Sequence, residues 1–177
     1  MGFTNLFWGF LFMFDFRING FDILPDFIGY LLFYLGASKL QHAHDRFAKA
    51  KPLCALMIFL SLPSLIEIKA GDIGELTLLW TLFSVVLLAI DLTIVHAFCR
   101  GIEAMAETQG APDLAATART RWTLYLILQV LVILMHAGGF GFPFLTAALV
   151  IPLLIFSIIV LVLMMSLMNA AANRLQT

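Results

Sequence analysis

Long uninterrupted apolar runs constrain this chain more than any other feature of its sequence. A helix that spans a bilayer needs about 20 apolar residues, and five runs approach or exceed that length: residues 21–38, 52–68, 76–99, 122–142 and 144–168. A sixth run, residues 3–16, gives only about 21 Å of helix. We predict a short, tilted helix there, with a half-helix or an interfacial segment as the alternatives.

The composition excludes the other main classes of protein. Of the 177 residues, 62% are hydrophobic and 12% are charged, whereas soluble domains carry roughly a quarter charged residues. Disordered chains have few hydrophobic and many charged residues, which excludes that class here. A net charge of −1 gives no basic surface for nucleic acid. The chain is therefore predicted to be an all-α integral membrane protein, with residues 1–177 forming one compact bundle of five to six transmembrane helices.

The positions of Lys and Arg predict the orientation. If the long runs alternate in direction, eight of the ten basic residues lie on one side: Lys39, Arg46, Lys49, Lys51, Arg100, Arg119, Arg121 and Arg174. Only Arg17 and Lys69 lie on the other. Cytoplasmic loops carry the excess of basic residues, so we expect a multi-pass plasma-membrane protein with a cytoplasmic C-terminus.

The segment 100–121 is the longest polar stretch. Ile102 and Met105 keep a helical spacing, the sequence Gly110-Ala111-Pro112 ends the helix, and Asp113 is a suitable cap for a new one. We therefore expect a helical hairpin that protrudes into the cytoplasm.

A polar site is predicted near the middle of the bilayer around Asp91, which lies nine residues before Arg100. Ionisable residues at such depth are functional candidates by default. Counted from Ala111, Asp91 is 20 residues before the turn and Gln129 is 18 after it, whereas Ser84 is 27 before and His136 is 25 after. These two facing pairs predict a substrate or proton site, with a purely structural hydrogen-bonded contact between two helices as the alternative.

A second polar cluster lies between the first two apolar runs. It consists of Asp15, Arg17, Asp22 and Asp26. Irregular polar backbone is tolerated near a membrane only where protein or water satisfies it. The cluster would suit a cation or an amine-bearing ligand, and the alternative is an interfacial turn with helix caps and an Asp–Arg pair.

Other chemistry finds little support in the sequence. His42, His44, Asp45, His96 and Cys99 are of metal-ligating types, but the loop histidines have no defined spacing to the helical pair, so neither a metal site nor a cofactor is predicted. Phosphate-binding glycine loops, zinc-protease motifs and nucleophile elbows are absent. No catalytic residues are therefore assigned.

Three functions remain open at this stage. The leading hypothesis is a small transport or solute-binding membrane protein that binds a small molecule or an ion, with proton coupling through the Asp91 site. The second is a non-catalytic accessory subunit that docks through the hairpin. The third is a membrane-embedded enzyme acting on a lipidic substrate. Because so short a bundle has a thin interior, we also expect a homo-oligomer or a membrane partner subunit.

Overall fold

The computed structural model describes residues 2–13, 17–18, 21–22, 26–62, 77–138 and 143–175. Side chains are described over residues 2–13, 26–62, 82–135 and 148–175. The elements are six helices and one short strand pair, in the order α1 (Gly2–Phe12), β1 (Arg17–Ile18), β2 (Phe21–Asp22), α2 (Asp26–Leu40), α3 (Asp45–Leu60), α4 (Thr77–Thr108), α5 (Pro112–Gly138) and α6 (Pro143–Arg174).

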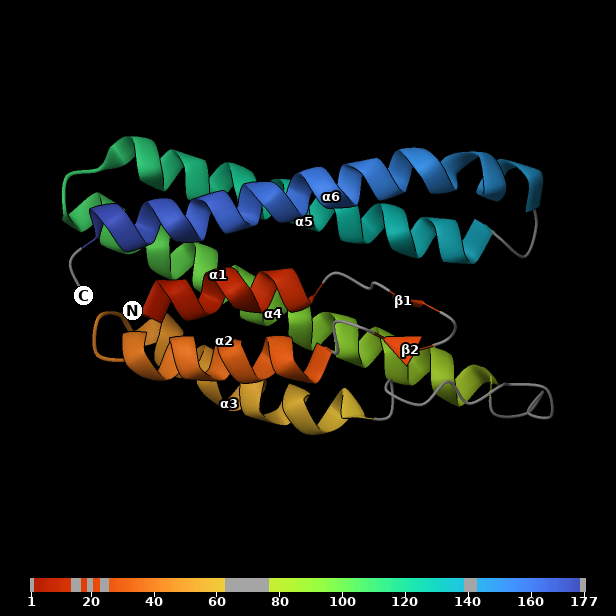
Figure 1. Ribbon diagram of the computed structural model, residues 1–177, viewed down its shortest axis with the longest axis horizontal. Helices are drawn as coiled ribbons and strands as arrows, with labels where there is room; N and C mark the ends of the chain where they lie inside the picture. Colours follow the sequence, from red (N-terminus) through yellow and green to blue (C-terminus); the bar gives the residue numbers. More distant parts are fainter. Residues whose placement is uncertain are drawn as a thin grey trace.

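The six helices form a closed ring. Each packs against the next one along the chain, and α6 returns to pack against α1 (Figure 1). Both termini, the α2–α3 turn and the α4–α5 turn lie at the same end of the bundle. The predicted all-helical bundle is thus confirmed in its general form.

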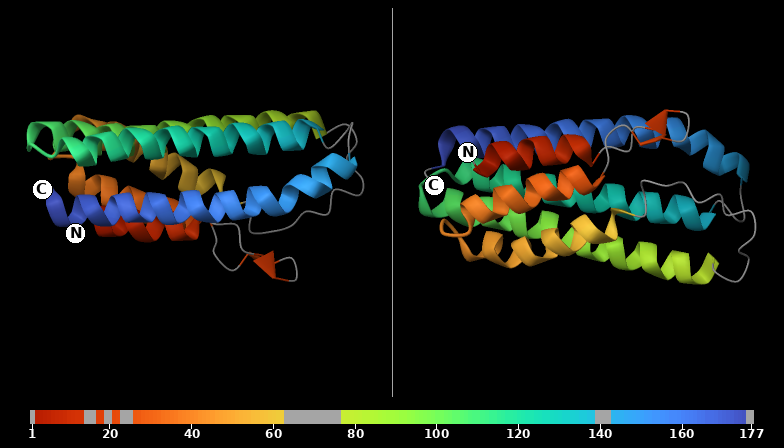
Figure 2. Two further views of the ribbon diagram at one scale, coloured as in Figure 1. Left: turned by 90° about the horizontal axis from the view of Figure 1, so that it is seen from above. Right: turned by 60° about the horizontal axis from the view of Figure 1, so that its bottom comes forward.

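The helices fall into two length classes. The long helices α4, α5 and α6 have 32, 27 and 32 residues, and within the described part they are long and apolar enough to cross a membrane. The short helices α1, α2 and α3 have 11, 15 and 16 residues, or about 17–24 Å of helix against a hydrocarbon core of about 30 Å. Figure 2 shows all three beside one half of the long helices. Five to six crossings therefore remain a prediction.

The predicted helix–turn–helix is present between α4 and α5. Gly110 adopts a φ of 75°, a left-handed conformation typical of the residue that ends a helix, and the Ala111 amide donates to the Ala106 carbonyl at 2.8 Å. The apolar residues Ile102 and Leu114 are buried by other parts of the chain. Protrusion of the hairpin beyond the bundle stays a prediction.

Aromatic side chains from four helices fill the centre of the ring. Phe3 of α1 meets Phe47 of α3 with ring centroids 5.9 Å apart, and Phe33 of α2 meets Phe98 of α4 at 5.3 Å. These pairs join helices that are not direct neighbours in the ring, so they add contacts across its interior.

Paired glycines bring α1 and α2 into close contact. A Cβ at Gly9 would lie 3.1 Å from the Gly29 carbonyl oxygen, and one at Gly36 would lie 3.0 Å from the Gly2 carbonyl oxygen. The two glycines of each helix are seven residues apart, so they share one face of that helix. Small residues allow such close backbone approach in membrane bundles.

Burial divides the bundle into two halves. The six-helix half consists of α1–α3 with residues 91–108, 112–125 and 160–174 of the long helices, and it contains nearly all the buried side chains. The three-helix half consists of residues 82–90, 126–135 and 148–159, where Leu128 is the single buried residue in the described side chains. Its surface is rich in exposed Leu, Ile and Val.

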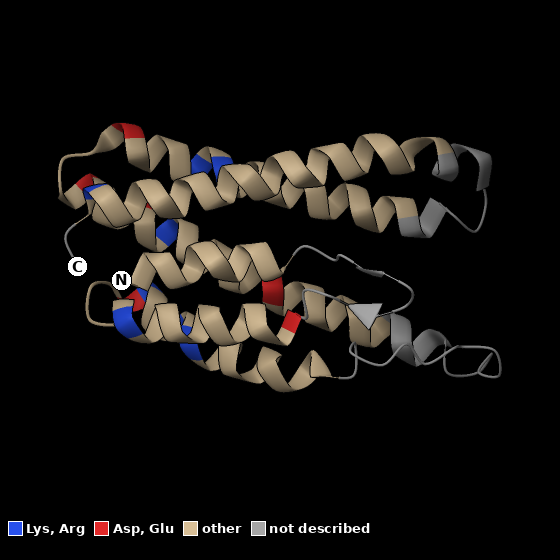
Figure 3. Ribbon diagram, in the orientation of Figure 1, with Lys and Arg blue, Asp and Glu red and all other residues tan. Residues whose placement is uncertain are grey.

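The charged residues follow the same division. In Figure 3 the Lys and Arg residues whose side chains are described lie in the half of the bundle that contains both termini. They comprise the eight basic residues that the sequence assigns to one side. Their common location agrees with the predicted alternation of the chain, while the identity of that side as cytoplasmic stays a prediction.

Candidate functional site

Asp91 is the most unusual side chain in the described part of the bundle. It is only 5% exposed and accepts hydrogen bonds from two tyrosine hydroxyls, from Tyr30 at 3.0 Å and from Tyr125 at 2.5 Å. An isolated buried carboxylate is costly, and hydrogen bonds to the charged group offset part of that cost. We call these three residues the Asp–Tyr clamp.

The clamp joins three helices. Asp91 lies near the middle of α4, Tyr125 comes from the neighbouring α5, and Tyr30 comes from α2 across the ring. Tyr30 follows Gly29, one of the two glycines at which α2 closely approaches α1, and its ring packs 6.1 Å from that of Phe33. Its position is therefore fixed by the packing of the short helices.

The position of the clamp in the bundle is equally distinctive. Tyr30 lies near the start of α2, at the end of the short helices that faces the three-helix half (Figure 1). Asp91 is also the first buried residue of α4 within its described side chains. The carboxyl group thus lies at the boundary between the two halves.

The chemistry of the clamp depends on the charge of Asp91. An ionised carboxylate accepts hydrogen bonds from both hydroxyls, whereas a protonated carboxyl becomes a donor itself and competes with them. A protonated Asp91 can donate its O–H to one tyrosine hydroxyl, which then accepts a hydrogen bond from the carboxyl instead of donating one. A proton that reaches Asp91 would change the contacts between α2, α4 and α5.

Gln129 is connected to Asp91 through Tyr125. It lies four residues after Tyr125, on the same helix face, and its side chain interacts with the Tyr125 hydroxyl. The sequence paired Gln129 directly with Asp91, but both hydrogen bonds recorded to Asp91 come from tyrosines. The Tyr125 hydroxyl therefore interacts with both predicted partners.

Ser84 and His136 form the second pair predicted from the sequence. Ser84 is exposed, although it lies two turns before Asp91 on the same helix face. The reason is that this face leaves the interior where α1–α3 end. The His136 side chain lies outside the described residues, so its predicted pairing with Ser84 stays a prediction.

The two tyrosines were missed by the sequence reasoning. The chain has only three Tyr against 17 Phe, and a buried Tyr hydroxyl usually has a hydrogen-bond partner. Tyr30 and Tyr125 both lie within apolar runs, which is the signal that would have nominated them as partners of Asp91.

The second predicted cluster is described only in part. Arg17 of β1 is the backbone partner of Asp22 of β2, and Asp26 begins α2 one turn before Tyr30. Asp15 lies outside the described residues. Binding of a cation or an amine by this cluster stays a prediction.

A separate ionic network lies nearer the end of the bundle that contains both termini and the eight Lys and Arg residues, which we call the basic end. Glu103 is 5% exposed and forms ion pairs with Arg100 at 2.7 Å and with Arg119 of α5. His96 receives a hydrogen bond from Arg100 Nε at 3.4 Å and packs 4.8 Å from the Trp122 ring. Within the described residues, no three His, Cys, Asp or Glu side chains are grouped so as to hold a metal ion.

No family model, no curated protein and no solved structure matches this chain.

Proposed function

We propose that this chain is a proton-coupled membrane transport protein in which Asp91 binds and releases the proton. One observation carries the proposal: a buried carboxyl group is hydrogen-bonded to hydroxyls of two other helices, at the boundary between the two halves of the bundle. Ionisable residues inside membrane bundles commonly belong to proton relays or ion pathways.

The proposed coupling follows from the hydrogen bonds. In the ionised state Asp91 holds Tyr30 and Tyr125 together, so the short helices stay docked to the long hairpin. When a proton binds, one hydroxyl loses its acceptor and the contact between α2 and α5 weakens. A small change at the carboxyl is thereby converted into a movement of one packed group of helices against another.

The proposed setting is the plasma membrane, with the basic end and the C-terminus in the cytoplasm. Two findings support it: the long helices could cross a membrane, and the Lys and Arg residues whose side chains are described gather in one half of the bundle (Figure 3), which is the pattern expected of a cytoplasmic side. The exposed apolar surface of the three-helix half would contact lipid, a second copy or another membrane subunit.

The two alternative functions receive less support. An accessory subunit that docks through the hairpin would need Ile102, Met105 and Leu114 at its surface, but these side chains are buried within the chain. An enzyme using paired carboxylates would need a second acid at Asp91, whose recorded hydrogen-bond partners are tyrosine hydroxyls.

Proton movement in proteoliposomes tests the proposal. The protein is reconstituted with a pH-sensitive dye inside the vesicles, and defined solutes are added outside: amino acids, monosaccharides, nucleosides, dicarboxylates and inorganic phosphate. We expect at least one solute to drive proton movement in the wild type. Asp91→Asn, which keeps the shape of the side chain, should abolish it.

The matched control is Asp45→Asn, which removes an exposed carboxylate from the first turn of α3 and should transport like the wild type. Two results contradict the proposal. One is the absence of solute-driven proton movement in the wild type, and the other is equal movement in Asp91→Asn.

A further inference from the structure

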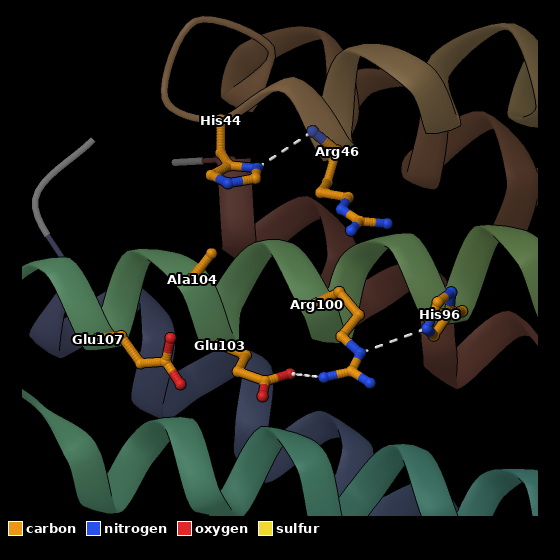
Figure 4. Close-up of a pocket in the computed structure, with 7 residues that line it drawn as sticks. All are labelled: His44, Arg46, His96, Arg100, Glu103, Ala104 and Glu107. Carbon is orange, nitrogen blue, oxygen red and sulfur yellow. Dashed lines mark hydrogen bonds and ion pairs between the residues drawn. The ribbon is translucent and has the colours of Figure 1, made fainter.

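A pocket opens at the basic end of the bundle, between the start of α3 and one face of α4. Its volume is about 350 Å³, and Figure 4 shows the seven residues that line it: His44, Arg46, His96, Arg100, Glu103, Ala104 and Glu107. It lies more than one helical turn along α4 from Asp91 and shares no residue with the Asp–Tyr clamp.

Two guanidinium groups face this pocket from different helices. Arg100 of α4 uses one nitrogen for Glu103 and another for His96. Arg46 of α3 has no carboxylate within ion-pair distance in the described part of the chain, and both guanidinium groups act electrostatically on His96. Positive charge is therefore concentrated on one side of the pocket.

The two histidines add further donors. His44 caps α3, and its Nδ1 accepts a hydrogen bond from the Arg46 amide at 3.1 Å. The Nε2 of His96 accepts from Arg100. A neutral imidazole that accepts at one nitrogen carries its hydrogen on the other, so each ring retains one N–H donor.

The two carboxylates of the pocket are compensated by arginine. Glu103 is paired with both Arg100 and Arg119, and Glu107 lies 3.8 Å from Arg119. Neither acid is therefore a free counter-charge for Arg46. The pocket offers unpaired cationic and N–H donor groups, which are the groups that bind anions.

From this arrangement we propose that the pocket binds a phosphate group. Guanidinium groups form paired hydrogen bonds with phosphate oxygens. The basic end is the part of the chain assigned to the membrane surface, where anionic headgroups lie. The phosphate belongs either to a lipid headgroup or to a free phosphate compound. The proposal does not depend on proton coupling at Asp91.

Binding to three single-site variants tests the proposal. The protein is held in phosphatidylcholine nanodiscs and titrated calorimetrically with inorganic phosphate and with glycerol 1-phosphate. In Arg46→Gln we expect affinity to fall by about tenfold or more, as for a lost charge-assisted hydrogen bond. Lys49→Gln removes the same charge from an exposed position of the same helix that does not line the pocket and should bind within about twofold of the wild type.

Glu107→Gln should change the affinity for the phosphate probes in the opposite direction. It removes a negative charge from the rim of the pocket, so a bound anion should bind about threefold more tightly. A cationic ligand would show the reverse of both effects. Equal losses in Arg46→Gln and Lys49→Gln would overturn the proposal, because they would indicate general attraction to a basic surface.

A second arm distinguishes the source of the phosphate. Native mass spectrometry compares retention of phosphatidylglycerol with that of phosphatidylcholine, in the wild type and in the same three variants. Selective retention that depends on Arg46, without binding of the soluble probes, identifies a lipid headgroup. Saturable binding of the soluble probes identifies a free phosphate compound. If neither arm shows saturable binding, the proposal is overturned.

Discussion

The two halves of this bundle are built on different principles. In the six-helix half, phenylalanines and close glycine contacts make a packed interior, and the charged residues lie around it. In the three-helix half, large apolar side chains such as Ile155 and Ile159 are exposed instead. The same helices α4–α6 run through both halves. Local environment, rather than helix type, therefore decides which side chains are buried.

The comparison also explains the position of Asp91. A carboxyl group placed further into the three-helix half would lack the tyrosines that hydrogen-bond to it, and one placed further into the six-helix half would lie among phenylalanines. The boundary is where α2 can supply Tyr30 and α5 can supply Tyr125. A polar group is thus located where two differently packed regions meet.

The largest effect is expected from removing the acceptor of the clamp. Asp91→Leu leaves two buried tyrosine hydroxyls without their partner, at about 1–3 kcal/mol each, so the free energy of unfolding should fall by about 2–6 kcal/mol. Thermal or denaturant unfolding in detergent measures this loss. Restoration of stability by the triple variant Asp91→Leu, Tyr30→Phe and Tyr125→Phe would confirm the cause, whereas unchanged stability of the single variant would show that the clamp does not hold α2 to α4 and α5.

The next effect distinguishes the surfaces of the two halves on a single helix. Ile155 is 53% exposed in the three-helix half of α6, and Ala172 is exposed near the basic end of the same helix. Ile155→Lys should cost about 2.5–3.5 kcal/mol in membrane insertion, because the charge would contact lipid. Ala172→Lys should insert like the wild type. A glycosylation-based insertion assay compares them, and equal insertion would contradict the assignment of the three-helix half to the bilayer.

The smallest of the three effects concerns the interior of the six-helix half. A side chain at Gly9 would collide with Phe33, which is fully buried against Phe10 and Phe98. Gly9→Leu should therefore destabilise the protein by about 1–3 kcal/mol. Thr4→Leu, at an exposed position of the same helix, is the control, and equal unfolding temperatures for the two variants would contradict close packing of α1 on α2.

Local signals in the sequence predicted much of this structure. Each apolar run overlaps one of the six helices, although α3 begins at Asp45, seven residues before its run. The Gly110-Ala111-Pro112 segment marks the turn between α4 and α5, and the eight basic residues lie in one half. Asp91, which the sequence singled out as a carboxyl within an apolar run, is buried inside the bundle, while its depth in the bilayer stays a prediction. These features depend on hydrophobicity, helix termination and charge, which neighbouring residues determine.

What the sequence did not reveal depends on contacts between distant helices. The return of α6 to α1 closes the ring, and Ile102 and Leu114 near the α4–α5 turn are buried within the chain. The pairing of Asp91 with Tyr30 joins residues 61 positions apart. Helical periodicity places a side chain on a face but does not identify the distant helix that covers that face.

The central claim is that the charge of Asp91 controls how the two groups of helices are joined. Spin labels at Leu35 of α2 and Ile127 of α5, both exposed, report the separation of these helices in lipid, with Cys54 and Cys99 replaced by Ala. The measurement runs from about pH 4 to pH 9, a range that covers carboxyl titration in proteins. The account predicts a distance distribution that changes with pH in this parent protein and stays fixed when Asp91→Asn is added. A distribution that ignores pH in the parent, or that still responds to pH in Asp91→Asn, would contradict it.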